Sequence, residues 1–224
     1  MIKEIIGRFM KVSLAAAGVF LMGGASADVY TWTGNGTSNY WTDKGNWSPE
    51  PASTPTDVVF PAGQDWTVTC TWTVSYNSIE LPDGSGTVTF VNPAPNKGGV
   101  VSSAGSITIG AGREIKVDGI ELQVRDCYTT GSSDGTLRLT SGAISPGTTS
   151  PSFFGGNANV IVEDGTFGLE NSTLNFTNNA TLTVHEGLAQ AQNGFSGVPI
   201  HPASPLRAFS CWEGLLGIHM RIRT

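Results

Sequence analysis

The sequence predicts an all-β protein made of stacked turns of short parallel strands. Two segments are copies of one another, and period-2 alternation of apolar and polar residues recurs along the chain before them. The first copy begins at Asn157 and reads NANVIVEDG, and the second begins 22 residues later at Asn179 and reads NATLTVHEG. A fixed period of about 20–50 residues is typical of an architecture in which each repeat packs on its neighbours.

The spacing inside one period indicates three strands per turn. Apolar pairs recur at 160/162, 167/169, 174/176 and 182/184, so that successive pairs begin seven or eight residues apart. Leu137 precedes Val160 by 23 residues, and Gly142 precedes Gly165 by the same interval, which predicts one further turn. The sequence therefore predicts a right-handed parallel β-helix in which Val160 rests over Leu182. A β-sandwich is the alternative, because Asp-Gly pairs at 83–84, 118–119, 134–135 and 164–165 are typical of tight turns.

The longest alternating run, residues 66–76, predicts one strand with Trp66 and Trp72 on its buried face. Shorter strands are expected at 87–90, 106–109, 114–117 and 136–139. No amphipathic helical pattern occurs between Asp28 and Gly187. These observations together favour an all-β chain.

Four segments follow from the composition. Residues 1–27 read as a secretory signal, with a basic start, an apolar run and the small-residue cleavage pattern Ala25-Ser26-Ala27. Residues 28–63 form an aromatic N-terminal segment, and residues 64–187 form the stacked turns. Residues 188–224 lose the alternation and gain prolines and arginines, which predicts an irregular, non-native tail with a short helix around Leu215–Met220.

Charge and cysteine content limit the partners. The chain has a formal net charge of −6, and without residues 1–27 it has nine basic and 17 acidic side chains. An acidic surface repels nucleic acid and anionic membranes. Export would permit a disulfide, with Cys70 and Cys127 as the candidate pair and Cys211 left over. The three histidines lie apart and no zinc spacing occurs, so neither a metal nor a cofactor is expected.

The most specific pattern lies in residues 30–60: Trp32-Thr33-Gly34, then Trp41, then Asn46-Trp47, then Asp57 to Phe60. This order of residues resembles the W-x-G … W … N-W … D-x-V-x-F pattern in the opening segment of bacterial autotransporter-associated β-strand repeat proteins and related secreted β-helix proteins. The resemblance implies a large surface or secreted protein whose corresponding segment has no catalytic motif. This chain departs from that pattern because it is short and lacks a long repeat array.

The aromatic motif predicts a cap over the first turn of the stack. An open end would expose core residues and unpaired strand edges. Trp32, Trp41 and Trp47 are expected to cover that end, with indole N–H groups bonded to backbone carbonyls. Asn46 and Asp57 are expected to hold turns through bonds to the backbone. In the alternative, Trp32, Trp41 and Trp47 form an exposed platform that stacks on sugars.

No nucleophile, zinc-protease or nucleotide-binding motif appears in the sequence. Asp118, Glu121 and Asp126 near Lys116 and Arg125 form the one mixed-charge patch, which a polysaccharide lyase or hydrolase would need. The sequence favours a non-catalytic, exported structural or adhesin-like protein of the bacterial surface or extracellular space, with glycans or envelope components as partners. A carbohydrate-binding module is the alternative.

Cleavage after Ala27 gives the first test. We expect protein secreted from a bacterial host to begin at Asp28, because the small residues before it suit signal peptidase. Intact-mass measurement of the secreted material checks this, and retention of Met1 or Met10 would contradict it.

Overall fold

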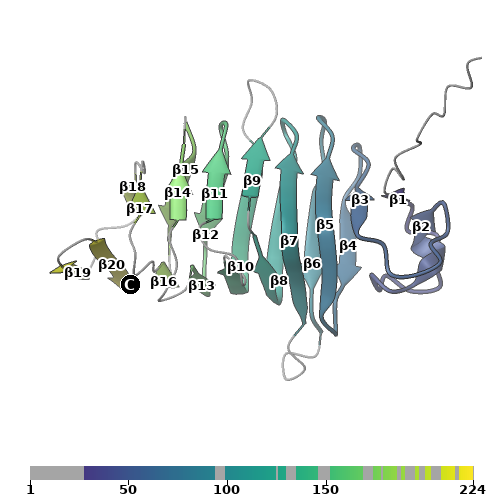
Figure 1. Cartoon of the computed structure of the whole chain (residues 1–224), viewed down its shortest axis with the longest axis horizontal. Coiled ribbons are helices and arrows are strands. Elements are labelled where there is room, and N and C mark those ends of the chain that lie inside the picture. The colour runs from purple at the N-terminus through teal and green to yellow at the C-terminus, as the bar shows by residue number, and fades with distance from the viewer. Residues whose placement is uncertain are drawn as a thin grey trace, which may run out of the picture.

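The computed structural model describes residues 28–93, 99–124, 126–129, 135–145, 152–168, 174–177, 179–185, 188–189, 195–196, 200–202, 208–214 and 217–223. The described chain is all-β, and its one helical element is the 3-10 turn η1 (Lys44–Asn46). The strands lie side by side along the longest axis of the molecule, roughly in chain order from β1 to β18 (Figure 1).

Two long ladders of parallel strands run along the molecule. Ladder A joins, in order, β1 (Val29–Trp32), β3 (Asp57–Val59), the end of β5 (Val74–Leu81), the end of β7 (Val100–Ile109), β9 (Asp126–Thr129), β11 (Ser152–Gly155), β14 (Leu174–Phe176) and β17 (Phe195–Ser196). Ladder B joins β4 (Trp66–Thr69), β6 (Thr87–Val91), the start of β8 (Glu114–Gln123), the start of β10 (Thr136–Ser145), β12 (Asn159–Val162), β15 (Thr181–Val184) and β18 (Ile200–Pro202).

A third parallel ladder, ladder C, uses the remaining parts of the long strands. It joins the starts of β5 and β7, the ends of β8 and β10, β13 (Thr166–Phe167) and β16 (Leu188–Ala189). The chain passes through ladders A, B and C in turn and then returns to A, and we call one such passage a coil. Antiparallel pairing joins β2 (Trp47–Ser48) to β1, and β20 (Gly217–Arg223) to both β19 (Ala208–Gly214) and β16.

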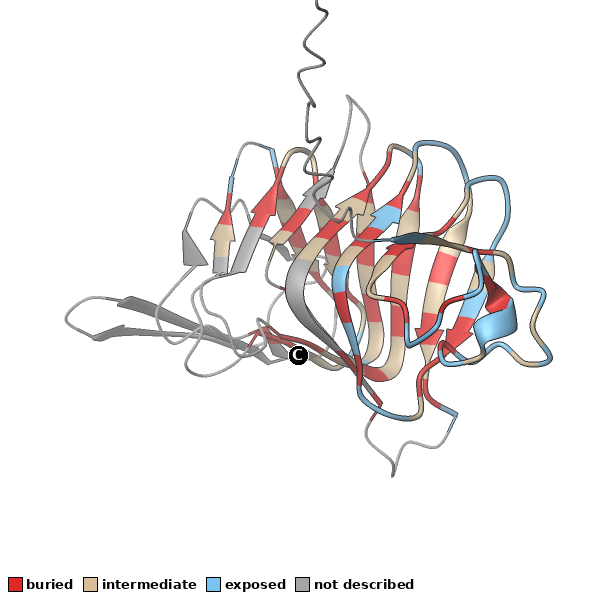
Figure 2. Ribbon diagram, turned by 45° about the vertical axis from the view of Figure 1, so that its right-hand side comes forward, coloured by how far each residue is buried: buried red, intermediate tan, exposed pale blue. Residues whose placement is uncertain are grey.

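Each ladder contributes a column of buried side chains to a shared core, and ladder B contributes a second column, formed by Val88, Ile115, Leu137, Val160 and Leu182. Ladder A supplies Val58, Ile79, Ile107, Cys127, Phe154 and Phe176. Ladder B supplies Val68, Phe90, Val117, Leu139, Val162 and Val184. Ladder C supplies Val74, Val101, Leu122, Ile144, Phe167 and Ala189. Buried and half-buried residues alternate along the strands, as period-2 geometry requires (Figure 2).

The register expected from the sequence copy is confirmed. Val160 pairs with Leu182 across β12 and β15, and Leu137 pairs with Val160 across β10 and β12. The strands expected at 87–90, 106–109, 114–117 and 136–139 all form, each within a strand of the structure. A shift of one residue would turn every buried side chain of a strand outward, so the alternation and the copy fix the register together.

Glycines stand where one coil turns closely over the next. A Cβ on Gly142 (φ 92°) would lie 2.2 Å from the carbonyl oxygen of Ile120, and a Cβ on Gly165 (φ 101°) would lie 2.6 Å from that of Gly142. The corner therefore excludes a side chain in successive coils. The Asp-Gly pairs ending at Gly84, Gly119 and Gly165 do adopt positive φ, but at corners between parallel strands.

Arg113 is buried within this stack, with only 1% of its surface exposed. Its Nε donates to the Gly86 carbonyl, and its two terminal nitrogens donate to the carbonyls of Phe60, Pro61 and Pro82. All five guanidinium N–H groups thus have acceptors. Desolvation by burial lowers the pKa of Arg113 from its ordinary value. The side chain connects the corners of three successive coils.

The expected continuous strand at 66–76 is wrong. The chain leaves ladder B after Thr69 and enters ladder C at Val74, so residues 70–73 form a corner. Trp72, expected inside, is therefore 68% exposed. Trp66 is half-buried against the core, as its inward phase predicts.

The candidate disulfide is absent, because Cys70 and Cys127 are both free. Their side chains are buried among the core residues, and desolvation raises the pKa of each thiol to about 12. Both cysteines thus serve as small apolar core residues.

The ladders extend past both expected boundaries of the stacked segment. β1 and β3 lie within residues 28–63 and already belong to ladder A. β16, β17 and β18 continue the three ladders beyond Gly187, and β20 is a strand where a short helix was expected. The expected signal, residues 1–27, lies outside the described residues.

The glycine corners give a direct test of close stacking. We expect Gly142→Ala to lower the free energy of unfolding by roughly 2–5 kcal/mol, because it adds positive-φ strain and a clash with the Ile120 carbonyl. Gly63→Ala is the matched control: Gly63 has φ 93° but nothing within 4 Å of an added Cβ. We expect only about 1–2 kcal/mol there. Urea unfolding of both variants measures the difference, and equal losses would contradict close stacking at Gly142.

Candidate functional site

The three N-terminal tryptophans form one buried aromatic cluster at the β1 end of the core. Trp32, Trp41 and Trp47 are 1%, 0% and 3% exposed. Their rings surround Phe60 at centroid distances of 5.7, 6.1 and 5.9 Å, and Trp41 also contacts Phe90 of ladder B. The cluster therefore continues the apolar core into the residues that precede the first complete coil.

This burial agrees with the predicted cap and contradicts the alternative, in which Trp32, Trp41 and Trp47 form an exposed sugar platform. Their ring faces contact one another and Phe60, so they offer no open face for stacking. The Trp47 indole nitrogen donates to the Trp41 carbonyl at 2.8 Å, as a cap requires. The Trp41 indole nitrogen is buried and has no partner among the described residues.

Asn46 organises the loop that carries the cap. Its side-chain oxygen accepts from the Gly36 N–H at 2.8 Å, and its amide nitrogen donates to the carbonyls of Ser38 (2.8 Å) and Tyr40 (3.0 Å). The side chain is fully buried, and its loss would leave these part-buried backbone groups without their partners. The expected role of Asn46 is confirmed. Asp57 instead bonds side chains, among them Ser78 at 2.8 Å in the next coil.

Asp43 supports the same loop from its exposed side. The hydrogen bond from the Ser38 hydroxyl is the largest cause that lowers the pKa of Asp43, whereas desolvation raises this pKa. Hydrogen bonds from the Ser38 and Gly45 N–H groups and from the Thr37 hydroxyl lower the pKa further. A lowered folded-state pKa means that the carboxylate stabilises the loop at neutral pH. That contribution is lost as the pH falls through the folded-state pKa.

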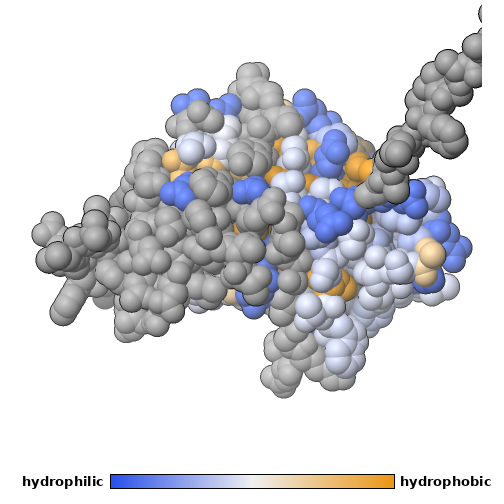
Figure 3. All heavy atoms as spheres, viewed as in Figure 1, coloured by the Kyte–Doolittle hydropathy of each residue, from blue (hydrophilic) through white to orange (hydrophobic). Residues whose placement is uncertain are grey.

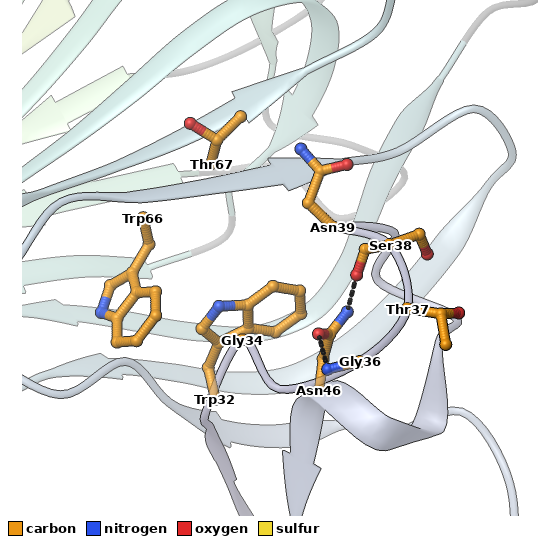
Figure 4. Close-up of a pocket in the computed structure, with 9 residues that line it drawn as sticks. All are labelled: Trp32, Gly34, Gly36, Thr37, Ser38, Asn39, Asn46, Trp66 and Thr67. Carbon is orange, nitrogen blue, oxygen red and sulfur yellow. Dashed lines mark hydrogen bonds between the residues drawn. The ribbon is translucent and has the colours of Figure 1, made fainter.

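A pocket of about 370 Å³ opens between this loop and the first strand of ladder B (Figure 4). The two tryptophan rings and the loop and strand residues that line it are all uncharged: Trp32, Gly34, Gly36, Thr37, Ser38, Asn39, Asn46, Trp66 and Thr67. Its size is at the low end of the roughly 300–1,000 Å³ that small-molecule sites occupy. Its walls combine aromatic and amide or hydroxyl groups.

The orientation of Trp66, on one side of the pocket, is fixed by its surroundings. Its indole nitrogen donates to the Pro61 carbonyl at 3.0 Å, and the same carbonyl accepts from Arg113. Gly34 lies against the ring, because a Cβ there would be 2.9 Å from the Trp66 Cζ3 atom. Arg113 thus supports the pocket from inside the stack.

Two acidic residues of the mixed-charge patch expected around Lys116 bond serine hydroxyls of the next coil. Asp118 accepts from the Ser141 hydroxyl at 2.7 Å, and Glu121 accepts from that of Ser145 at 2.6 Å. These bonds join neighbouring coils. Arg125 lies outside the described residues.

Two charged features were missed by sequence reasoning: Arg113 and an ion network on the outer face of ladder B. Arg138 bonds Glu114 of the preceding coil at 3.0 Å and also bonds Glu163 of the following coil. Desolvation lowers the pKa of Arg138, but hydrogen bonds and charge from Glu114 and Glu163 outweigh it, so the pKa is raised. The strand register, once known, would have indicated this network, since Arg138 lies 24 and 25 residues from its partners.

Within the described ranges, no group of three or more His, Cys, Asp or Glu side chains is placed to hold a metal ion. The same part of the chain contains no helix of the length and apolarity needed to cross a membrane. No protein-family model, curated protein or solved structure matches this chain.

Asn46 tests how the cap is held. We expect Asn46→Ala to lower the free energy of unfolding by about 2–4 kcal/mol, because part-buried backbone groups lose their partners. Asn77→Ala is the control, since Asn77 is exposed and, among the described residues, its side-chain amide donates only to the Thr56 and Asp57 side chains. We expect less than about 1 kcal/mol there. Urea unfolding followed by tryptophan fluorescence measures both, and similar losses would contradict the role of Asn46.

Proposed function

We propose that this chain is a non-catalytic, exported structural or adhesin-like protein built as a right-handed parallel β-helix. The observation that carries the proposal is the unbroken parallel register from β1 to β18 in three ladders. A β-sandwich is built mainly from antiparallel strands, so parallel pairing in every ladder favours the β-helix. The resemblance of the tryptophan segment to bacterial autotransporter-associated repeat proteins supports the same assignment.

The outer side chains support a structural role. Many of them pair with the equivalent residue of the next coil: Asn179 donates to Asn157 at 3.0 Å, and Thr181 donates to Asn159 at 3.1 Å. The described surface in Figure 3 is mainly hydrophilic or neutral, with small separate hydrophobic areas. Such hydrogen-bonded rungs between neighbouring coils stabilise a long, soluble stack. They also occupy polar groups that a reactive cluster would need free.

The cap supports a protein that stays dispersed after export. Uncovered ends of parallel stacks present core and strand edges to other copies. Here the tryptophan cluster closes the β1 end, and the 17 acidic against nine basic side chains that remain without residues 1–27 add mutual repulsion. An extracellular or outer-surface location, reached through the signal ending at Ala27, is part of this proposal.

The alternative, sugar binding by Trp32, Trp41 and Trp47, has less support. Binding on these rings would require the cap to open and expose Phe60 and Phe90 beneath them. The cost of exposing several large aromatic side chains, about 2 kcal/mol each, would exceed the gain from one stacked sugar. A glycan or envelope partner therefore belongs on a surface that the cap leaves accessible.

Retention of bacterial envelopes tests the structural proposal. We expect a surface coated with the mature protein to retain isolated envelope fragments, because the folded outer face provides the contacts. Gly142→Ala should lose retention at a temperature where it is unfolded, and Gly63→Ala should keep it. Equal retention by folded and unfolded protein would contradict the proposal. So would turnover of a polysaccharide that is lost in Lys116→Ala and Asp118→Ala but kept in Asp83→Ala.

A further inference from the structure

We propose that the pocket between Trp66 and the loop of residues 34–39 binds one neutral sugar ring, such as a terminal pyranose of a glycan. This site differs from the buried three-tryptophan cluster and shares only Trp32 with it. The proposal does not rest on the envelope role, and it stands or falls on a different measurement.

The aromatic part of the site is accessible and rigid. Trp66 is half-buried, in contrast to the 0–3% exposure of Trp41, Trp32 and Trp47. Its indole nitrogen is held by the Pro61 carbonyl, so the ring needs little ordering when a ligand arrives. Gly34 lies against the Trp66 ring and Gly36 lies against Asn46, and neither adds a side chain that would fill the pocket. The apolar face of a pyranose can stack on such a ring.

The polar part of the site has unused hydrogen-bonding capacity. Thr67 is exposed, and its hydroxyl has no hydrogen-bond partner within the described part of the chain. Asn39 uses its side-chain oxygen to accept from Thr69 at 3.0 Å, which leaves its amide N–H groups available. In Figure 4 that amide nitrogen lies on the side toward Thr67. Figure 4 shows these two side chains on one side of β4 and the Trp66 and Trp32 rings on the other, so the polar groups line the rim of the pocket and the rings line its floor. A sugar ring seated between them can direct vicinal hydroxyls at this hydroxyl and this amide.

The other polar lining groups are already occupied. Asn46 is fully bonded to the backbone, and the Ser38 and Thr37 hydroxyls both donate to Asp43. No lining side chain carries a charge. The neighbouring Asp43 carboxylate already accepts hydrogen bonds from the Thr37 and Ser38 hydroxyls. A charged ligand would therefore lose hydration without gaining a free opposite charge, and a purely apolar ligand would leave Thr67 and Asn39 without partners. A neutral ligand that carries hydroxyl groups fits both constraints.

The pairing along ladder B supplies a matched pair of positions. Thr67 pairs with Thr89 of the next coil, and both point outward on β-strands. Thr89 does not line the pocket. Thr→Val removes only a hydroxyl at each position, and Thr→Tyr adds a large ring that blocks the pocket at Thr67 alone.

Ligand-observed NMR by saturation transfer, with the mature chain, tests the proposal. The probes are the methyl glycosides of glucose, galactose, mannose and N-acetylglucosamine, together with phenyl phosphate and tetramethylammonium. We expect at least one glycoside to bind and neither charged probe to do so. Loss of one neutral hydrogen bond in Thr67→Val should weaken binding about fivefold. Thr67→Tyr should abolish binding, whereas Thr89→Val and Thr89→Tyr should bind as the unmodified chain does.

The proposal is overturned if no glycoside binds to folded protein, if binding survives Thr67→Tyr, or if a charged probe is preferred. Circular dichroism of each variant confirms that the fold is kept, and Thr67→Val is conservative enough to interpret if Thr67→Tyr is not folded. The envelope assay, repeated with Thr67→Val, separates the two proposals. Full retention by an unmodified chain that binds no glycoside would leave the structural role intact and remove the sugar site.

Discussion

The fixed register between successive coils is the constraint on which the rest of this structure depends. Each buried column works only if an inward residue lies over an inward residue, as Val160 does over Leu182. The corners allow no adjustment, because the backbone at Gly142 and Gly165 approaches the coil before it within the space of a side chain. Outside, the same register brings Arg138 between Glu114 and Glu163 and aligns Asn157 with Asn179. The core, corners and polar rungs therefore share one geometric origin.

Arg113 shows how the stack can include a buried charge. An isolated guanidinium in an apolar interior is unfavourable, and none of the carboxylates in the described ranges bonds this one. Instead, the corners of the two preceding coils direct carbonyls at all five of its N–H groups, so the charge is satisfied by backbone dipoles. Lysine has three donors and no planar fork, and it would leave some of these carbonyls without partners. Because the Phe60 and Pro61 carbonyls belong to the coil beneath the cap, the same residue links the cap to the stack.

Local pattern in the sequence was sufficient for the strands and for much of the register. Alternation predicted the strands, and the 22-residue copy predicted the pairing of Val160 with Leu182. Alternation predicted the wrong side for Trp72, because an alternating pattern of apolar and polar residues does not show where a strand ends and a corner begins. Arg113 was missed because a charged side chain is normally expected at the surface. The pocket was missed because Trp66 and Thr67 face the loop of residues 34–39 only after the chain has folded.

The position of the pocket follows from the way a ladder begins. Inside the stack, an outward polar residue has a neighbour in the coil before it and another in the coil after it. Its side chain can form hydrogen bonds with both neighbours, as Arg138 does with Glu114 and Glu163. Ladder B begins at β4, so among the described strands Thr67 has a paired residue on one side only, Thr89. On the other side the chain bridges β4 at Tyr40 and Thr69, and the cap loop then turns away from Thr67. The first strand of a closed stack is thus where the register leaves polar groups free beside an aromatic ring. A binding site there requires no departure from the regular coils, because the junction between cap and coil supplies both the space and the unpaired donors.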